Sequence, residues 1–237
     1  MTAPVSLSVV IPAFDEEKRL PGTLAAILPF LRSRGETFEV VVVDDGSTDG
    51  TADAARKGGP EVRLLQNPGN RGKGYSVRNG MLNAGGAWRL MSDADLSTPI
   101  EELDRLKAAL ADGAEVAIAS RAVSGANLEK RQSIMRETSG RFFNVIVRVL
   151  HLPGIKDTQC GFKLFSAAAA EAAFRESKLD GFAFDVEALV LAHRAGFRIR
   201  EVPVTWRNDE QSRVSFARGL AAFVDLFRLK FRRRVNR

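Results

Sequence analysis

Short runs of β-branched and other apolar residues alternate with helix-like segments along this chain, and the runs end in polar turns. The strongest run, 38–43, leads directly into Asp44-Asp45-Gly46 and then into a new helix-like segment. Strands that are apolar on both faces are typical of parallel sheets buried between helices. The pattern therefore predicts an α/β fold in which a mainly parallel sheet is covered by helices on both faces.

The same alternation sets the expected elements but leaves the strand order open. Strands are expected near 6–11, 38–43, 61–66, 87–92, 114–119 and 197–204. Helices are expected near 16–33, 50–58, 72–84, 100–111, 131–150, 167–176, 185–195 and 217–232. With 237 residues, 45% of them hydrophobic, and no linker or internal repeat, the chain is expected to form one domain. The one cysteine, Cys160, excludes an internal disulfide and is expected to be packed inside.

Acidic residues follow three of the expected strands. Asp15-Glu16-Glu17 follows the first, Asp44-Asp45 the second and Asp93-Ala94-Asp95 the fourth. Ligands of open α/β sheets bind beyond the carboxyl ends of the strands, so these clusters are expected to meet at one crevice. Like charges gathered there raise the energy unless a cation or a ligand compensates them.

The third cluster has the spacing of a metal clamp. Asp93 and Asp95 stand where a strand becomes a loop, so both carboxylates can turn toward one cation. Mg²⁺ and Mn²⁺ prefer oxygen ligands and commonly keep substrate phosphates in their coordination shell, which makes the pair a candidate clamp for a nucleotide diphosphate. Taken alone, the motif also fits a solvated turn in which Asp95 or Ser97 caps a helix that begins near Pro99.

The motifs taken together resemble those of the family 2 glycosyltransferases. Within that family they are most similar to the polyprenyl-phosphate sugar transferases, above all the dolichyl-phosphate β-glucosyltransferase group. The motifs that carry the resemblance are 10–16, 43–50, Asn70-Arg71-Gly72-Lys73-Gly74, Asp93-Ala94-Asp95, Ser120-Arg121, 157–163 and 182–187. The first four are typical of nucleotide-sugar transferases broadly, and the last two point to the lipid-phosphate branch.

The resemblance implies a GT-A fold, one Rossmann-like domain with a mixed sheet over 1–215. Its donor half would lie at about 1–120 and its acceptor half at about 121–215. The implied reaction is inverting transfer of a hexose, expected to be glucose, from a nucleotide sugar, expected to be a UDP-sugar, to polyprenyl or dolichyl phosphate, which gives a β-linked product. Two alternatives stay open: a family 2 transferase acting on a hydroxyl of a glycan or glycolipid, and a non-catalytic nucleotide-sugar binding protein.

The resemblance also assigns residues to the donor. The nucleoside half is given to Pro12, Ala13, Phe14 and Glu16, and to Asp44 and Asp45 as acceptors from the uracil ring. Arg71 and Lys73 stand in a glycine-flanked loop where exposed N–H groups and a positive helix end favour the diphosphate; a solvated helix start is the competing interpretation. Asp95 is expected to bind Mg²⁺ or Mn²⁺ directly. Asp93, next to Ala94, is expected to hold the ribose or to reach the metal through water.

The second half supplies the acceptor side. The residues carried over are Arg121, Arg136 and Ser139, with Arg131, Asp157 and Gln159 around them, and Arg207 and Arg213 in a loop that closes on the diphosphate. A phosphate monoester is largely dianionic at neutral pH and needs no general base. A hydroxyl acceptor needs a carboxylate base, for which Asp157 or Asp185 could serve, although Asp185 and Glu187 also suit the first turn of a helix.

The net charge of +6 comes from the end of the chain. From residue 213 onward, eight Lys and Arg against Asp225 leave +7, so the preceding body is near −1. Phenylalanines recur at helical spacing in 216–237, as an interfacial helix on an anionic membrane requires; an amphipathic helix packed on the body is the alternative.

Met1 stands close to the first strand, so no signal peptide is expected, and the enzyme is expected to be cytoplasmic and peripheral on the cytoplasmic membrane face. No nucleic-acid module is recognisable, and the oligomeric state stays open.

Overall fold

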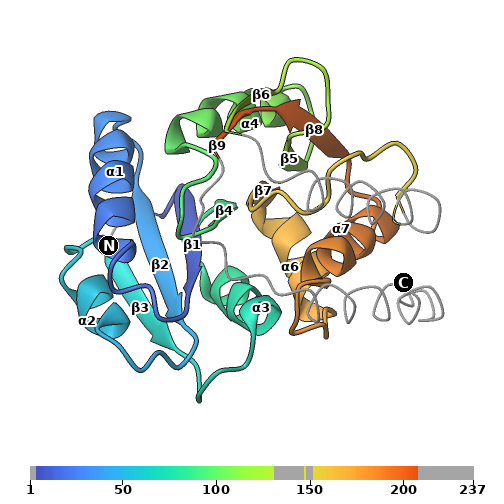
Figure 1. Cartoon of the computed structure of the whole chain (residues 1–237). Coiled ribbons are helices and arrows are strands. Elements are labelled where there is room, and N and C mark those ends of the chain that lie inside the picture. Colours follow the sequence, from blue (N-terminus) through green and yellow to red (C-terminus); the bar gives the residue numbers. More distant parts are fainter. Residues whose placement is uncertain (1–3, 131–146, 148–151, 208–237) are drawn as a thin grey trace.

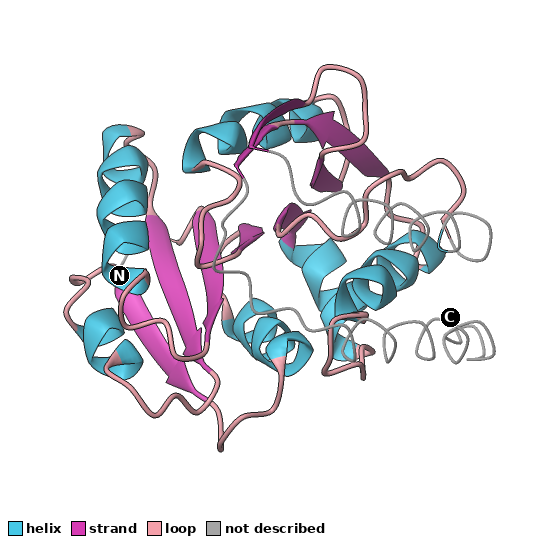
Figure 2. Ribbon diagram, viewed as in Figure 1, coloured by secondary structure: helices cyan, strands magenta, loops and turns pink. Residues whose placement is uncertain are grey.

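The apolar runs form the strands of a seven-stranded sheet in the order β3-β2-β1-β4-β7-β5-β8 (Figures 1 and 2). The computed structural model describes residues 4–130, 147 and 152–207. The strands of this sheet are β1 (Leu7–Ala13), β2 (Phe38–Asp44), β3 (Val62–Gln66), β4 (Trp88–Ser92), β5 (Val116–Ser120), β7 (Phe162–Ser166) and β8 (Ile199–Pro203). Neighbouring strands are parallel except at β7, which is antiparallel to both β4 and β5. The expected mainly parallel, mixed sheet is confirmed.

Helices lie on both faces of the sheet (Figure 1). They are α1 (Leu20–Ser33), α2 (Thr51–Arg56), α3 (Lys73–Asn83), α4 (Leu103–Ala111), α6 (Ala167–Arg175) and α7 (Phe184–Arg194), with the 3-10 turn η1 (Ile100–Glu102) before α4. Successive residues of a strand point to opposite faces. Val9 and Val42 therefore lie in one hydrophobic cluster with residues of α1 and α4, whereas Val10 and Val43 lie in another with α3, α6 and α7. Burial on both faces explains why these strands are apolar throughout.

A small two-stranded parallel sheet, β6 (Asn127–Lys130) with β9 (Thr205–Arg207), accompanies the main one. These two strands and β7 were not expected from the sequence. β6 and β9 have four and three residues, too few for a pattern to show. β7 carries Lys163 in its interior, and a lysine interrupts the apolar run by which a buried strand is identified. The helices expected near 131–150 and 217–232 lie outside the described residues, apart from Val147.

Candidate active site

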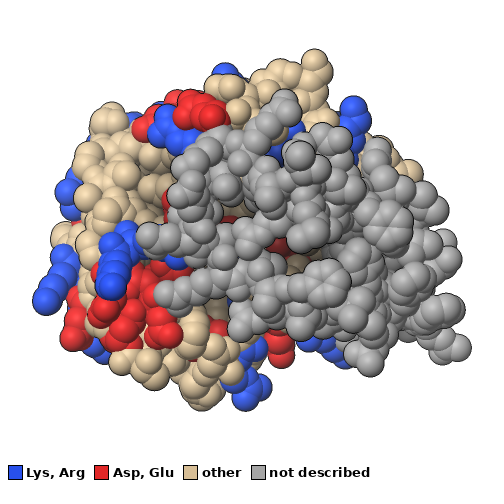
Figure 3. All heavy atoms as spheres, in the orientation of Figure 1, with Lys and Arg blue, Asp and Glu red and all other residues tan. Residues whose placement is uncertain are grey.

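The carboxyl ends of β1, β2 and β4 meet at one edge of the sheet, because the three strands are adjacent and parallel. Asp45 donates its backbone N–H to the carbonyl of Ala13 at 2.8 Å, which joins the first two strand ends. Phe14, the next residue along, is 37% exposed and is the one large hydrophobic side chain exposed in the described part of the chain. Figure 3 shows acidic side chains gathered over the α2 end of the molecule. The expected convergence of the acidic strand ends is confirmed.

Several of the rim carboxylates build turns. Asp15 has a left-handed backbone (φ 52°), and its side chain accepts a hydrogen bond from Thr48 N at 3.0 Å. Ser47 Oγ accepts one from Asp15 N at 2.9 Å, and Asp44 Oδ1 accepts one from Ser47 N at 3.0 Å. Asp44 itself is buried. These bonds join the turn after β1 to the turn after β2, so the contacts of Asp44 support a structural role for its carboxylate.

The other nucleoside-side residues lie close to these turns. Pro12 and Ala13 are the last two residues of β1. Glu16 forms an ion pair with Arg19 at 3.2 Å. Ala94, between the two aspartates of the metal-type motif, is buried, and its carbonyl accepts a hydrogen bond from Thr23 Oγ1. All four therefore lie at the rim where the resemblance placed the donor.

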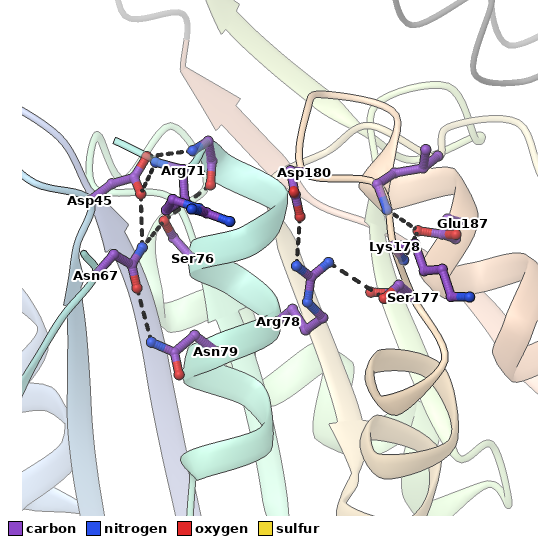
Figure 4. Close-up of polar contacts among 12 residues, drawn as sticks. Asp45, Asn67, Arg71, Ser76, Arg78, Asn79, Ser177, Lys178, Asp180 and Glu187 are labelled. Atoms are coloured by element: carbon purple, nitrogen blue, oxygen red, sulfur yellow. Dashed lines mark hydrogen bonds and ion pairs between the residues drawn. The ribbon is translucent and has the colours of Figure 1, made fainter. Parts of the chain in front are cut away.

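Asp45 holds the loop that leads into α3, residues 70–74, here called the glycine loop (Figure 4). Its Oδ1 accepts hydrogen bonds from Asn67 Nδ2 at 2.8 Å and Arg71 N at 2.9 Å, and its Oδ2 accepts one from Gly72 N at 2.8 Å. Asn67 Nδ2 also donates to Ser76 Oγ of α3 at 2.9 Å. The Asp45 side chain is buried. These contacts support a loop-holding role, and the uracil contact expected for Asp45 stays a prediction.

The backbone amides of the glycine loop are largely occupied. Arg71 N and Gly72 N donate to Asp45, and Gly74 N donates to Asp180 O at 2.8 Å. A Cβ on Gly72 would lie 2.5 Å from Asp180 O, so the glycine is needed for close approach; Figure 4 shows Asp180 beside α3. The expectation that these exposed N–H groups receive a diphosphate is therefore wrong for these three amides. The charged side chains of the loop remain for that task.

Lys73, the first residue of α3, reaches the metal-type motif. Its Nζ lies 2.7 Å from Asp93 Oδ1, an ion pair without hydrogen-bond geometry, so this buried oxygen has no hydrogen bond within the described residues. Burial lowers the pKa of Lys73, but the attraction of nearby carboxylates, led by Asp93, outweighs it, and the pKa is raised. Burial and the charge of Asp93 raise the pKa of Asp95. A divalent cation fits here, because the carboxylate oxygens of Asp93 and Asp95 are ligands that such an ion prefers, and its charge would offset the repulsion between the two carboxylates.

Strand β7 lies directly against Asp93. Ser92 pairs with Phe162 in the β4–β7 register, and Asp93 N donates to Gly161 O at 3.0 Å. A Cβ on Gly161 would overlap the Asp93 carboxylate. Gly161 therefore has to be a glycine for Asp93 to lie where it does, although the sequence placed its motif only on the acceptor side.

Asp95 lies in a strained turn. Leu96 has φ 46°, a conformation that costs energy for a residue with a bulky side chain. Ser97 N donates to Asp95 Oδ1 at 2.9 Å, and Ser97 O accepts a hydrogen bond from Arg207 N of β9 at 2.7 Å. No side chain caps η1, whose N-cap residue is Pro99. The interpretation of Asp95 or Ser97 as a helix cap is therefore wrong, and the turn is instead fastened to β9.

A buried ion pair joins β7 to α7. Lys163 is 2% exposed and pairs with Asp185. Burial raises the pKa of Asp185, although the Lys163 ammonium opposes the rise. Glu187 is fully buried and accepts hydrogen bonds from Lys178 N at 2.8 Å and Leu179 N at 2.7 Å (Figure 4). Both carboxylates thus make tertiary contacts, beyond any effect on the first turn of their helix, and Lys163 was missed because lysine usually indicates an exposed position.

On the expected acceptor side, Arg121 and Asp157 form a two-pronged ion pair. Arg121 Nε lies 2.7 Å from Asp157 Oδ2, and Nη2 lies 2.9 Å from Oδ1. The guanidinium also lies over the Trp206 ring, 5.3 Å from its centre. Burial would raise the pKa of Asp157, but Arg121 holds it below its ordinary value. Arg121 Nη1 donates to no described residue, so the cation has N–H groups left for an anion.

The remaining acceptor-side residues divide into two groups. Gln159 N donates to Asp157 Oδ1 at 3.2 Å, and Arg207 pairs through Nε with Glu129 Oε2 at 2.5 Å from an exposed position. The residues that lie outside the described part of the chain are Arg131, Arg136, Ser139 and Arg213. The structure thus brings Arg121, Asp157 and Gln159 together. Arg207 contacts the Asp95 turn through the hydrogen bond from its backbone N–H to Ser97 O.

None of the helices in the described part of the chain is long and apolar enough to cross a membrane. The described part also holds no group of three or more His, Cys, Asp or Glu arranged around a metal position. Within it, Asp93 and Asp95 are the candidate ligands.

Crystal structures of glucosyl-3-phosphoglycerate synthase from Mycobacterium tuberculosis have a similar fold. The complex with Mn²⁺, UDP-glucose and phosphoglyceric acid matches with a TM-score of 0.74 at 18% identity, over 95% of this chain and 80% of that chain. The complex with Mn²⁺, UDP and phosphoglyceric acid matches with a TM-score of 0.74 at 19% identity, over 96% and 79%. The chain therefore has the GT-A fold of these structures.

Residues 8–174 match the family model described as Glycosyl transferase family 2, and the chain belongs to this family. It is 37% identical to the dolichyl-phosphate β-glucosyltransferase of Drosophila melanogaster, over 89% of this chain and 70% of that protein. It is 39% identical to the protein of the same name from Mus musculus and 38% identical to that from Homo sapiens, over 88% of this chain and 69% of each. The chain is thus a dolichyl-phosphate β-glucosyltransferase-like glycosyltransferase.

Proposed function

We propose that this chain transfers glucose from UDP-glucose to dolichyl phosphate or a related polyprenyl phosphate, with inversion at the anomeric carbon. The names of its relatives supply the substrates. The observation that carries the proposal in the site is the Lys73–Asp93 ion pair, with Nζ 2.7 Å from Oδ1, which places a cation suited to the donor diphosphate at the end of β4. Arg121, paired with Asp157, supplies a second cation, suited to an acceptor phosphate.

The donor would lie along the rim of β1, β2 and β4. Phe14 offers an exposed ring for the uracil face, next to Pro12 and Ala13. Asp45 would serve the donor by holding the glycine loop. Lys73 would contact the diphosphate, because the surrounding carboxylates keep its ammonium charged. Arg71, at an exposed position of the same loop, is the second cation within reach.

Mg²⁺ or Mn²⁺ fits the oxygen donors of this rim. Asp95 would hold the ion directly, and Asp93 would do so directly or through water. When bound, such an ion supplies positive charge that stabilises the departing diphosphate. The repulsion between the Asp93 and Asp95 carboxylates and the raised pKa of Asp95 both support this assignment.

The acceptor phosphate would bind Arg121 through the Nη1 N–H groups, which have no acceptor among the described residues. Its dianionic oxygen would attack the anomeric carbon in line, form the new C–O bond and release UDP as the old C–O bond breaks. One such displacement converts an α-linked donor into a β-linked product. No proton needs to be removed from the acceptor, so the described residues need only orient the two phosphates and balance their charge.

Transfer to a hydroxyl is less well supported by the contacts. Asp157 and Asp185, the candidate bases for that reaction, are buried and already paired with Arg121 and Lys163. The lowered pKa of Asp157 makes it a poor proton acceptor at neutral pH. The Asp157 carboxylate already accepts hydrogen bonds from Arg121 N, Nε and Nη2 and from Gln159 N, which takes up its capacity to accept from a substrate hydroxyl.

Purified full-length protein, labelled UDP-glucose and a short-chain polyprenyl phosphate test the proposal. We expect an organic-extractable, mild-acid-labile product whose anomeric coupling constant shows a β linkage. The matching unphosphorylated polyprenol is the control acceptor, and GDP-sugars are the control donors. Faster transfer to the polyprenol than to its phosphate would overturn the proposed acceptor.

The basic segment 216–237 is proposed to hold the enzyme on the cytoplasmic face of a membrane, beside a catalytic domain at 1–215. Each Lys or Arg near an anionic surface contributes about 1 kcal/mol, so binding should depend strongly on salt. Deletion of 217–237 should release the protein from anionic vesicles and preserve activity on a soluble prenyl phosphate. If deletion unfolds the domain and the intact chain does not bind anionic vesicles at low salt, the segment belongs to the core.

A further inference from the structure

The Arg121 guanidinium is fixed by one buried carboxylate. Asp157, 2% exposed, accepts hydrogen bonds from Arg121 N at 3.0 Å, Arg121 Nε at 2.7 Å and Arg121 Nη2 at 2.9 Å. Its Oδ1 also accepts one from Gln159 N at 3.2 Å. A two-pronged contact sets both the place and the plane of a guanidinium. The position of Arg121 therefore depends on where Asp157 is held.

Asp157 is in turn held by Glu201 of β8. Glu201 Oε1 accepts hydrogen bonds from Asp157 N and from Ser120 Oγ, both at 2.8 Å. Glu201 Oε2 accepts one from Lys156 N at 2.8 Å. Ser120 is the last residue of β5, directly before Arg121. One carboxylate thus fastens the end of β5 and the 156–157 turn to the same strand.

We infer that Glu201 is a positioning residue, which sets the Arg121 guanidinium through Asp157 and so shapes the binding of the acceptor phosphate. Glu201 touches no reacting atom in this scheme. Loss of its carboxylate weakens the contacts of Asp157 N and Lys156 N, and because Asp157 is buried, a loss of the partner of its N–H drives local rearrangement. The Asp157 carboxylate then moves, and Arg121 moves with it. This inference rests on the acceptor role proposed for Arg121.

The matched control is Glu115, just before the start of β5. Its Oε2 accepts a hydrogen bond from Arg198 N at 2.8 Å, just before β8. Glu115 and Glu201 therefore make the same kind of carboxylate-to-backbone contact on one strand pair, Glu115 just before β5 and Glu201 in the middle of β8. Glu115→Gln should change stability about as much as Glu201→Gln without touching the Arg121 pair.

We expect Glu201→Gln to raise the KM for a short-chain prenyl phosphate about 10- to 100-fold, as small misplacements near a reacting group do. The KM for UDP-glucose should stay unchanged in both variants. A general loss of folded protein would lower kcat alone and equally in both variants. That result would overturn the inference, because positioning predicts an effect on the acceptor KM.

A second readout does not depend on the acceptor. In ¹⁵N-labelled full-length protein, the Nε–H of Arg121 should exchange slowly with solvent, and faster in Glu201→Gln but not in Glu115→Gln. Unchanged exchange in Glu201→Gln would overturn the inference. Arg121→Lys separates the acceptor role of Arg121 from the positioning role of Glu201. If Arg121→Lys leaves the KM for the acceptor unchanged, the proposed acceptor role of Arg121 is wrong. The exchange rates of the Arg121 Nε–H still decide whether Glu201 positions this side chain.

Discussion

Lys73 Nζ lies 2.7 Å from Asp93 Oδ1, so the first residue of α3 and the residue after β4 meet at one partly buried position. The contact joins the glycine loop to the metal-type motif, two segments twenty residues apart in the chain. Because Asp93 also lies against Gly161 of the segment before β7, three elements meet at this carboxylate. A change in any of these three elements is expected to alter the binding of the donor diphosphate.

Asp95→Asn should abolish most transfer and leave the fold intact. The raised pKa of Asp95 means that its charged form opposes folding, so stability falls as pH rises from the unfolded pKa through the raised folded pKa. At neutral pH without metal, the variant should therefore melt no lower than the parent. Mn²⁺ should raise the Tm of the parent only, and turnover should fall about 100-fold or more. Undiminished turnover with Mg²⁺ or Mn²⁺ would remove Asp95 from the site.

Asp45→Asn should weaken UDP and inorganic pyrophosphate to a similar degree. An amide in place of the carboxylate sets N–H groups against Arg71 N or Gly72 N, so the glycine loop relaxes and Lys73 loses its place. Calorimetric titration of UDP, uridine and pyrophosphate measures the effect. A loss confined to UDP and uridine would show that Asp45 reads the uracil ring instead.

Lys163→Met should destabilise the domain by about 3–5 kcal/mol, because it leaves the buried Asp185 charge without its partner. The double variant Lys163→Met with Asp185→Leu should recover most of that loss, since two apolar side chains replace the pair. Urea unfolding of the three proteins measures the difference. If the double variant is no more stable than Lys163→Met, the pair is not the cause.

Acid should weaken the Arg121–Asp157 pair. The pKa of Asp157 is lowered in the folded state, so its contribution to stability is present above the unfolded pKa, about 3.9, and is lost as pH falls through the folded value. The stability gap between the parent and Asp157→Asn should therefore be widest at neutral pH and narrow below about pH 4. Urea midpoints across this range test the sign; a gap that is the same at every pH would contradict it.

The central strands could be predicted from the sequence because the pattern that identifies each of them lies within one short segment. Phe38–Asp44 is apolar on both faces and ends in a polar turn, which is enough to identify a buried parallel strand. Once β1, β2 and β4 are recognised as parallel neighbours, the meeting of their acidic ends follows. Asp93 and Asp95 were found in this way, whereas Lys73 came from its glycine-flanked loop and the resemblance.

The sequence alone determined the α/β class, the acidic rim and the residues that belong to the donor motifs. The tertiary structure decided which of their groups are already occupied: Asp45 and the glycine-loop amides bond to one another, and Asp157 is committed to Arg121. It also revealed β7 as an antiparallel strand and Glu201 as the support of Asp157. The physical reason is that hydrogen-bond commitments and ion pairs join residues far apart in the chain, whereas periodicity records only what lies within one element.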